Sequence, residues 1–232
     1  MTDAPAPASV ITVAMEEEAA PFLERADRVT DVATRAHAAR RDLEIDGTSH
    51  VLLCSGIGFT AAAAAAAYGF YTLGSDVPVI SAGTAGGLAA GVEVGHVVVG
   101  SRYVNLNADA TAFGYALGQV PGMPADYAPD ATLAARALAA DVPGLTVQAG
   151  AIGSGEAFVT APRALRLRED FPDVVAVDME SAAIAQFAHT HGQRFLSVRA
   201  ISDLCAPDGS EFLTHVDDAA ARSAEVVLAL LK

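Results

Sequence analysis

Short apolar runs alternate with glycine turns and helical segments along most of the chain. The runs lack the apolar/polar alternation of half-exposed strands, so they predict buried strands. Segments of helical periodicity follow several of them, including an alanine-rich stretch and an amphipathic C-terminus. We therefore predict a single α/β domain over residues 1–232 with a largely buried central sheet, preceded by a flexible tail at residues 1–8. The expected strands begin at residues 10, 51, 78, 96, 147, 174 and 194, and the expected helices cover 15–26, 59–70, 131–140, 162–170, 179–191 and 219–232.

Two segments depart from this alternation. Residues 105–130 are polar and rich in glycine and proline. A loop of this length in a compact domain usually serves a site or an interface. The strand beginning at Pro78 is expected to stop in a glycine-rich loop, GTAGG at residues 83–87.

Composition narrows the function classes. Hydrophobic residues make up 52% of the chain, which is enough for a substantial core. The net charge of −14 argues against binding to nucleic acid or to an anionic membrane surface. Cys54 and Cys205 form neither a disulfide framework nor a zinc motif, which indicates a reducing, cytoplasmic location. The uncharged stretch 51–75 is rich in glycine and alanine, so we expect a helix packed in the core and no transmembrane span.

Acidic residues follow several predicted strands. They are Glu18, in the acidic segment after the first strand, Asp178 and Glu180 after the strand at 174, and Asp203 after the strand at 194. A single acidic residue at the start of a helix is common, because its negative charge interacts favourably with the helix dipole. Together at one edge of a sheet, however, carboxylates can divide into base, hydroxyl acceptor and acid, as glycosyl cleavage requires.

Two other patterns are weak evidence for a cofactor or metal site. Gly56, Gly58 and Ala61 match a dinucleotide-binding fingerprint, but Asp76 precedes the next strand instead of following it. Close packing of a helix on the sheet is the better interpretation. His189 and His191 lie two apart on a predicted helix and face different directions, so we expect surface or packing roles and no metal site.

The order of these segments resembles the 5'-methylthioadenosine/S-adenosylhomocysteine nucleosidases of the purine nucleoside phosphorylase superfamily. The likeness spans nearly the whole chain, and its most specific stretches are DATAFGY from Asp109, DMESAAIA from Asp178 and VRAISD from Val198. It implies a mixed β-sheet flanked by helices. It also implies hydrolysis of the N-glycosidic bond of methylthioadenosine and S-adenosylhomocysteine, an enzyme without cofactor or metal, and a homodimer.

The resemblance also implies roles for individual residues. Asp203 matches the acid that protonates adenine N7 or hydrogen-bonds to it, and Ser202 would orient Asp203. Glu18 matches the base that activates water, and Glu180 matches the carboxylate on a ribose hydroxyl. The other implied site residues are Arg199 and Thr84 near water and sugar, Phe158 and Val159 at adenine, Met179 under the ribose, Met15 and Ile57 on the apolar side, Ala85, Gly86 and Asp178 in matching segments, and Phe113, Tyr115 and Pro121 reaching into the neighbour's pocket.

The sequence departs from the family pattern in four places. Thr84 stands where serine is usual, and Asp178 where glutamate is common. Leu106 and Asn107 replace a frequent His-Asp pair, which could alter dimer contacts. The segment between Asp203 and Glu211 is shorter than the usual lid, which opens the question of selectivity at the 5' position.

Four rival functions follow from the same residues. A hydrolase of futalosine or 6-amino-6-deoxyfutalosine would share the fold and the same acidic and basic catalytic groups. A phosphorylase would need a cationic cradle near 83–87, which the acidic segment at 16–18 disfavours. A non-catalytic nucleoside binder would not need Glu18 and Asp203. An NAD-dependent oxidoreductase is disfavoured, because Asp76 precedes the strand that it would have to follow in order to bind the ribose of the cofactor.

Overall fold

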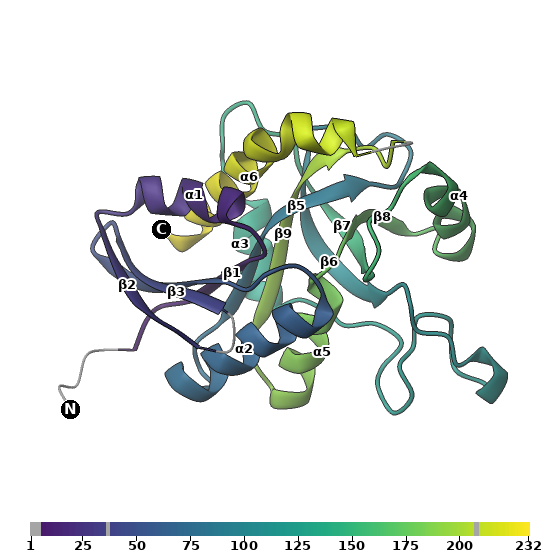
Figure 1. Cartoon of the computed structure of the whole chain (residues 1–232), viewed down its shortest axis with the longest axis horizontal. Coiled ribbons are helices and arrows are strands. Elements are labelled where there is room, and N and C mark those ends of the chain that lie inside the picture. Colours follow the sequence, from purple (N-terminus) through teal and green to yellow (C-terminus); the bar gives the residue numbers. More distant parts are fainter. Residues whose placement is uncertain (1–5, 36–37, 207–208) are drawn as a thin grey trace.

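The computed structural model describes residues 6–35, 38–206 and 209–232 (Figure 1). Strands of its sheet follow the order β2-β3-β4-β1-β5-β8-β7-β6-β9. Parallel and antiparallel neighbours both occur, so the predicted mixed α/β sheet is confirmed. The strands are β1 (Val10–Val13), β2 (Arg28–Arg35), β3 (Ala38–Ile45), β4 (Thr48–Cys54), β5 (Val79–Gly87), β6 (Val97–Asn105), β7 (Val147–Ser154), β8 (Val174–Asp178) and β9 (Phe195–Asp203).

Helices cover both faces of the sheet. They are α1 (Glu16–Arg25), α2 (Phe59–Leu73), α3 (Ala131–Leu138), α4 (Ala161–Asp170), α5 (Ser181–His191) and α6 (Ser210–Leu231), with a short 3-10 helix, η1 (Thr111–Phe113). One apolar core includes α1, α3 and α6, and a second includes α2 and α5. Figure 1 shows α1 and α6 above the sheet and α2 and α5 below it. Burial on both faces explains why the strands carry continuous apolar runs.

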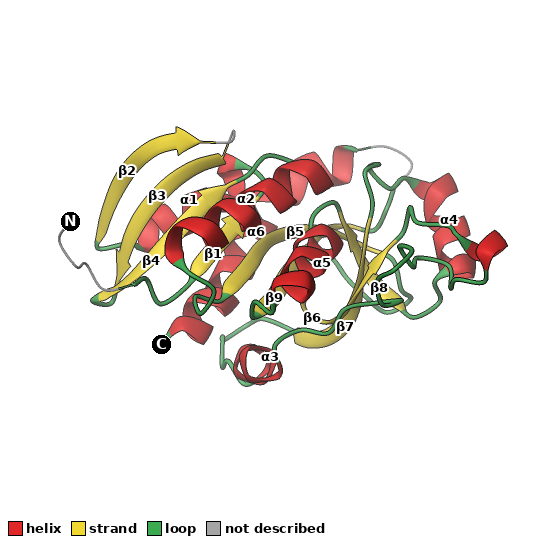
Figure 2. Cartoon of the chain, turned by 90° about the horizontal axis from the view of Figure 1, so that it is seen from below, coloured by secondary structure: helices red, strands yellow, loops and turns green. Residues whose placement is uncertain are grey.

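Strand β5 is the hub of the sheet. It pairs in parallel with β1 and β9, and its last two residues pair antiparallel with β8. The extra β5–β9 pairing closes β5, β8, β7, β6 and β9 into a ring (Figure 2). A register shift at Ala85 and Gly86 places Gly86 opposite Asp203. The ends of β5 and β9 therefore meet, which brings distant parts of the chain to one place.

Two sequence predictions need correction, and one hairpin was not predicted. Residues 83–87 continue β5 and are not a loop, because the small residues there pair with β8 and β9. The last helix begins at Ser210, nine residues before the expected start at Ala219. The β2–β3 hairpin was not predicted, because its described side chains are mostly exposed in β2 and mostly partly buried in β3, and they form no apolar run.

Two further expectations concern the termini and the membrane. The tail expected at residues 1–8 falls in part on residues 1–5, which lie outside the described residues, while the Ala8 N–H donates to the Ser49 carbonyl. Within the described ranges, no helix combines the length and the apolar character that a membrane crossing requires.

Candidate active site

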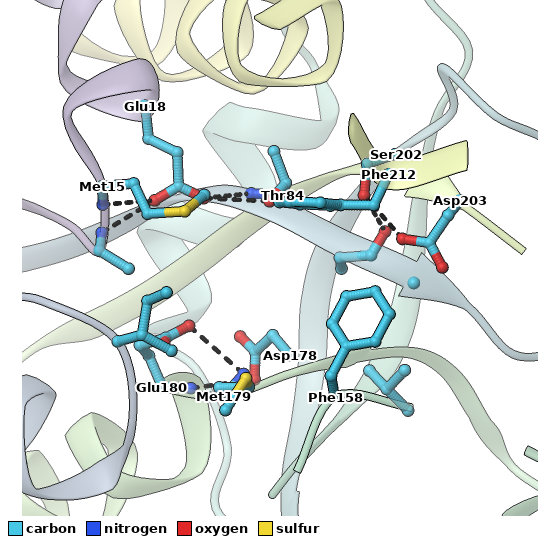
Figure 3. A pocket seen from close by; sticks show the side chains of 15 residues that line it. Met15, Glu18, Thr84, Phe158, Asp178, Met179, Glu180, Ser202, Asp203 and Phe212 are labelled. Atoms are coloured by element: carbon cyan, nitrogen blue, oxygen red, sulfur yellow. Dashed lines mark hydrogen bonds between the residues drawn. The ribbon is translucent and has the colours of Figure 1, made fainter. Parts of the chain in front are cut away.

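One pocket gathers side chains from the ends of β1, β5, β8 and β9 and from α6 (Figure 3). Most of the residues implied by the resemblance line it. Sequence reasoning missed Ala14, Val177 and Phe212, and only Phe212 carried a signal, as the first aromatic after Asp203. The lining residues are Ala14, Met15, Glu18, Ile57, Thr84, Ala85, Gly86, Phe158, Val177, Asp178, Met179, Glu180, Ser202, Asp203 and Phe212.

Glu18 is a buried carboxylate fixed by hydrogen bonds from two elements. One oxygen, Oε2, accepts from the N–H groups of Ala14 at 2.8 Å and Met15 at 3.3 Å. The other, Oε1, accepts from the N–H of Thr84 at 2.8 Å and from its hydroxyl at 3.1 Å. The first pair belongs to the junction of β1 and α1, and the second to β5. Glu18 therefore has a defined position on the upper wall of the pocket in Figure 3.

Gly83 makes this arrangement possible. A Cβ atom on Gly83 would lie 2.4 Å from Arg199 Nη1 and 2.5 Å from Glu18 Oε1, both far inside van der Waals contact. The residue has φ +154°. Only glycine lets Glu18 and Arg199 approach the same point of β5.

Arg199 lies behind the pocket and carries a charge in the core. Its side chain is 1% exposed and donates from Nε to Asp178 Oδ2 at 2.7 Å. Its Nη2 atom lies 3.7 Å from Glu180 Oε2. Burial alone would lower the pKa of Arg199, but Asp178, Glu180 and Glu18 together raise it above its ordinary value. The guanidinium thus stays charged and offsets the buried carboxylates.

Glu180 is buried at the start of α5, on the lower wall in Figure 3. Its Oε1 atom accepts from the Gly58 N–H at 3.0 Å. The glycine turn that resembled a dinucleotide motif therefore supplies a donor to this carboxylate. Burial raises the pKa of Glu180 to about 7, against the opposing effect of Arg199. Proton uptake by Glu180 is consequently possible near neutral pH.

Asp203 occupies the end of β9 on the far side of the pocket from Glu18 and Glu180 (Figure 3). The Ser202 hydroxyl lies 3.0 Å from Asp203 Oδ2, and the Cys205 N–H donates to Oδ1 at 2.9 Å. Burial raises the pKa of Asp203, and the negative charge of Glu211 adds to the rise. A carboxyl group that tends to keep its proton suits a general acid.

Apolar groups complete the pocket. The rings of Phe158 and Phe212 meet edge to face with centroids 5.8 Å apart. Met15 and Met179 approach from opposite walls in Figure 3. Val159 lines a smaller hollow that shares Phe158 and Asp203 with the main pocket. The site thus offers one apolar slot between the carboxylates of Glu18, Glu180 and Asp203.

Some predicted residues lie away from this pocket. Phe113 is 83% exposed in the long loop, and the described Phe113, Tyr115 and Pro121 do not line the pocket of their own chain. His189 is exposed, and His191 stacks on Phe187, in agreement with surface and packing roles. Among the described residues, no three His, Cys, Asp or Glu side chains are arranged to hold a metal ion.

Known proteins identify the group to which this architecture belongs. Residues 9–232 match the phosphorylase superfamily. A 5'-methylthioadenosine/S-adenosylhomocysteine nucleosidase from Anoxybacillus flavithermus is 41% identical, with 92% of this chain and 93% of the relative covered. The chain belongs to this nucleosidase family of the phosphorylase superfamily. A nucleosidase from Actinobacillus succinogenes is 44% identical over 81% of this chain and 83% of its own.

Solved structures of the nucleosidase family share the fold. The enzyme from Neisseria meningitidis, in complex with methylthio-immucillin-A, is 37% identical and superposes with a TM-score of 0.91, covering 97% of this chain and 98% of that one. The enzyme from Colwellia psychrerythraea, in complex with adenine, is 31% identical with a TM-score of 0.91, covering 98% of this chain and 95% of that one. The nucleoside phosphorylase/hydrolase-like architecture is therefore confirmed.

Proposed function

We propose that this nucleosidase hydrolyses the N-glycosidic bond of 5'-methylthioadenosine and S-adenosylhomocysteine, releasing adenine and the thioribose product. The observation that carries the proposal is the placement of Asp203, with a raised pKa, across one pocket from the carboxylates of Glu18 and Glu180. A futalosine-type substrate is not favoured, since the relatives named above are methylthioadenosine/S-adenosylhomocysteine nucleosidases.

Asp203 acts as the general acid. Adenine is a poor leaving group as an anion, so the C–N bond breaks more easily when a proton reaches N7. The raised pKa keeps a proton on Asp203 to higher pH than an exposed aspartate would. Ser202 orients the carboxyl group through its contact with Oδ2 and is itself held by the Ala85 carbonyl at 3.3 Å.

Glu18 acts as the base. A water molecule beside Oε1 would donate to the carboxylate while the rotatable Thr84 hydroxyl fixes its position. Thr84 offers the same hydroxyl as the serine common in the family, so this departure conserves the chemistry. The water's proton passes to Glu18 as its oxygen attacks the anomeric carbon.

Glu180 stabilises the sugar in the transition state, and Arg199 positions the carboxylates from behind the pocket. The Glu180 carboxylate accepts a hydrogen bond from a ribose hydroxyl, and its negative charge stabilises the positive charge that develops on the sugar ring. Arg199 holds Asp178 and lies near Glu180 without lining the described pocket, so it is a positioning residue.

The apolar slot binds adenine. Phe158 stacks on the base, and backbone groups of Phe158 and Val159 read its edge. Met179 lies under the ribose, and Met15 and Ile57 contact the apolar side. Ala85 and Gly86 are small residues where they line the wall, which leaves room for a flat purine ring.

Phosphorolysis is the rival reaction at this site. Attack by phosphate would require an unpaired cation beside the anomeric carbon. Among the described residues, Arg199 is the cation that pairs with the pocket's carboxylates; it is engaged with Asp178 and buried behind the wall. Phosphate would also meet the charge of Glu18, so water is the favoured nucleophile.

The test measures adenine release in phosphate-free buffer from methylthioadenosine, S-adenosylhomocysteine and 6-amino-6-deoxyfutalosine in separate reactions. We expect release from the first two without added phosphate. Release from the third alone, or release that depends on phosphate, would contradict the proposal. The ratio of kcat/KM values between the first two substrates measures how the short segment before Glu211 affects 5' selectivity.

We further propose a homodimer in which Phe113, Tyr115 and Pro121 cover the 5' group in the neighbour's pocket. A phenylalanine that is 83% exposed in the single chain supports this, since an exposed aromatic side chain suits an interface. Mixing Phe113→Ala with Asp203→Asn protein, then allowing subunits to exchange, tests it. A heterodimer contains one site with both native residues, so activity above that of either parent is expected. No gain over the parents, or a monomer in sedimentation, would refute the shared site.

A further inference from the structure

Glu211 connects two segments that meet at the pocket. It lies in the first turn of α6, and its Oε2 atom accepts a hydrogen bond from the Leu204 N–H at 2.8 Å. Leu204 directly follows Asp203, and Phe212, which directly follows Glu211, lines the pocket. A single carboxylate thus ties the helix that carries Phe212 to the segment that carries Asp203.

The backbone after Asp203 has an uncommon conformation that this bond supports. Cys205 has φ +56°, in the left-handed region that non-glycine residues rarely occupy. In this turn two consecutive N–H groups point to two carboxylates: Leu204 donates to Glu211, and Cys205 donates to Asp203 Oδ1 at 2.9 Å. Such a conformation persists only where its surroundings hold it. The Glu211 bond anchors the turn one residue before the amide that holds Asp203.

The charge of Glu211 also affects Asp203, in addition to the hydrogen bond that holds the turn. The Glu211 carboxylate raises the pKa of Asp203, after the larger effect of burial. The hydrogen-bond partners of the Asp203 carboxyl group, the Ser202 hydroxyl and the Cys205 amide, are uncharged, and Gly86 on β5 lies opposite Asp203 in the sheet. The nearby Cys205 thiol has a pKa raised to about 12 by burial and stays neutral. Glu18, Asp178 and Glu180 line the same pocket from other elements.

We infer that Glu211 is a positioning residue for the nucleosidase reaction, which fixes the turn that orients Asp203 and holds Phe212 over the bound nucleoside. This role rests on the proposed function. It predicts that loss of the hydrogen bond and loss of the charge have separable effects, because the bond governs geometry and the charge governs the proton on Asp203.

The experiment compares Glu211→Gln, Glu211→Ala and a control, Glu225→Ala, which removes an exposed carboxylate from the same helix. Kcat and KM for adenine release from methylthioadenosine are measured across pH, together with Tm. Glu211→Gln keeps an oxygen for the Leu204 N–H, so we expect rates near wild type at low pH, with the loss of activity on raising pH shifted to lower pH. For Glu211→Ala we expect a higher KM, a lower kcat and about a tenfold lower kcat/KM.

Identical pH profiles and rate constants for Glu211→Ala and Glu225→Ala would overturn the inference, even if Tm falls. Hydrogen exchange of the Leu204 and Cys205 amides gives a readout that needs no substrate. These amides should exchange faster in Glu211→Ala than in wild type, and unchanged exchange would also overturn the inference. A wild-type protein that releases no adenine would refute the proposed function, whereas the exchange measurement would still decide whether Glu211 holds the turn.

Discussion

Arg199 Nε donates to Asp178 Oδ2 at 2.7 Å, and both side chains are 1% exposed. Asp178 in turn accepts from the hydroxyls of Ser154 and Ser181. Arg199 Nη2 also donates to Ser81 Oγ at 2.9 Å. The ion pair is thus fully enclosed by polar partners. It places one positive charge among Asp178, Glu180 and Glu18 without exposing it to the nucleoside.

Replacing Arg199 with methionine should strongly destabilise the protein. The change leaves Asp178 and Glu180 buried without their cation, and breaking such a pair costs about 3–5 kcal/mol in the free energy of unfolding. The matched control is Arg194→Met, which breaks the partly exposed Arg194–Asp130 pair of 2.9 Å and should cost no more than about 1 kcal/mol. Urea denaturation of both variants measures the difference, and equal costs would contradict the structural role of Arg199.

Asp203→Asn should reduce adenine release by about 10²–10⁴-fold, the range that a general acid contributes. The amide oxygen can still accept from the Cys205 N–H, so adenine binding and Tm should change little. Turnover and calorimetric titration with adenine measure the two effects. Asp217→Asn, at an exposed position on α6, is the control. A rate near wild type for Asp203→Asn would show that another group protonates the base.

Glu180 should make stability depend on pH. Its pKa rises from 4.5 to about 7 on folding, mainly because of burial, so the folded protein binds more protons than the unfolded chain between these values. The contribution of Glu180 to the free energy of unfolding is therefore fully present below about 4.5 and is lost as pH rises through about 7. Denaturation at a series of pH values should show a weaker decline over this window for Glu180→Gln. A decline as steep as in wild type would assign it to other groups.

The same substitution at two glycines should have opposite effects. Gly83→Ala forces a methyl group against Arg199 and Glu18, so we expect a loss of about 1–3 kcal/mol in the free energy of unfolding, with reduced turnover. Gly69 lies inside α2, where an added Cβ would sit 3.5 Å from Val10 in ordinary contact. Gly69→Ala should stabilise the helix by about 0.5–1 kcal/mol. Chemical denaturation decides both signs, and a neutral Gly83→Ala would disprove the tight approach.

Local pattern was sufficient to predict much of the fold. The apolar runs at β1, β4, β8 and β9 are strands, because burial on both faces favours mostly apolar side chains. The β2–β3 hairpin was not predicted because its described side chains are mostly exposed in β2 and mostly partly buried in β3, which leaves no apolar run. The glycines at the end of β5 read as a loop, although pairing with β8 and β9 holds them as a strand.

The sequence by itself determined which carboxylates end the strands, and its motif order indicated the nucleosidase family. Only the tertiary structure decided that Gly58 donates to Glu180, that Arg199 pairs with Asp178, and that Glu211 holds the turn after Asp203. The reason is physical: hydrophobic periodicity is set by neighbours along the chain, whereas burial, charge pairing and pKa depend on groups that only the closure of the sheet brings together.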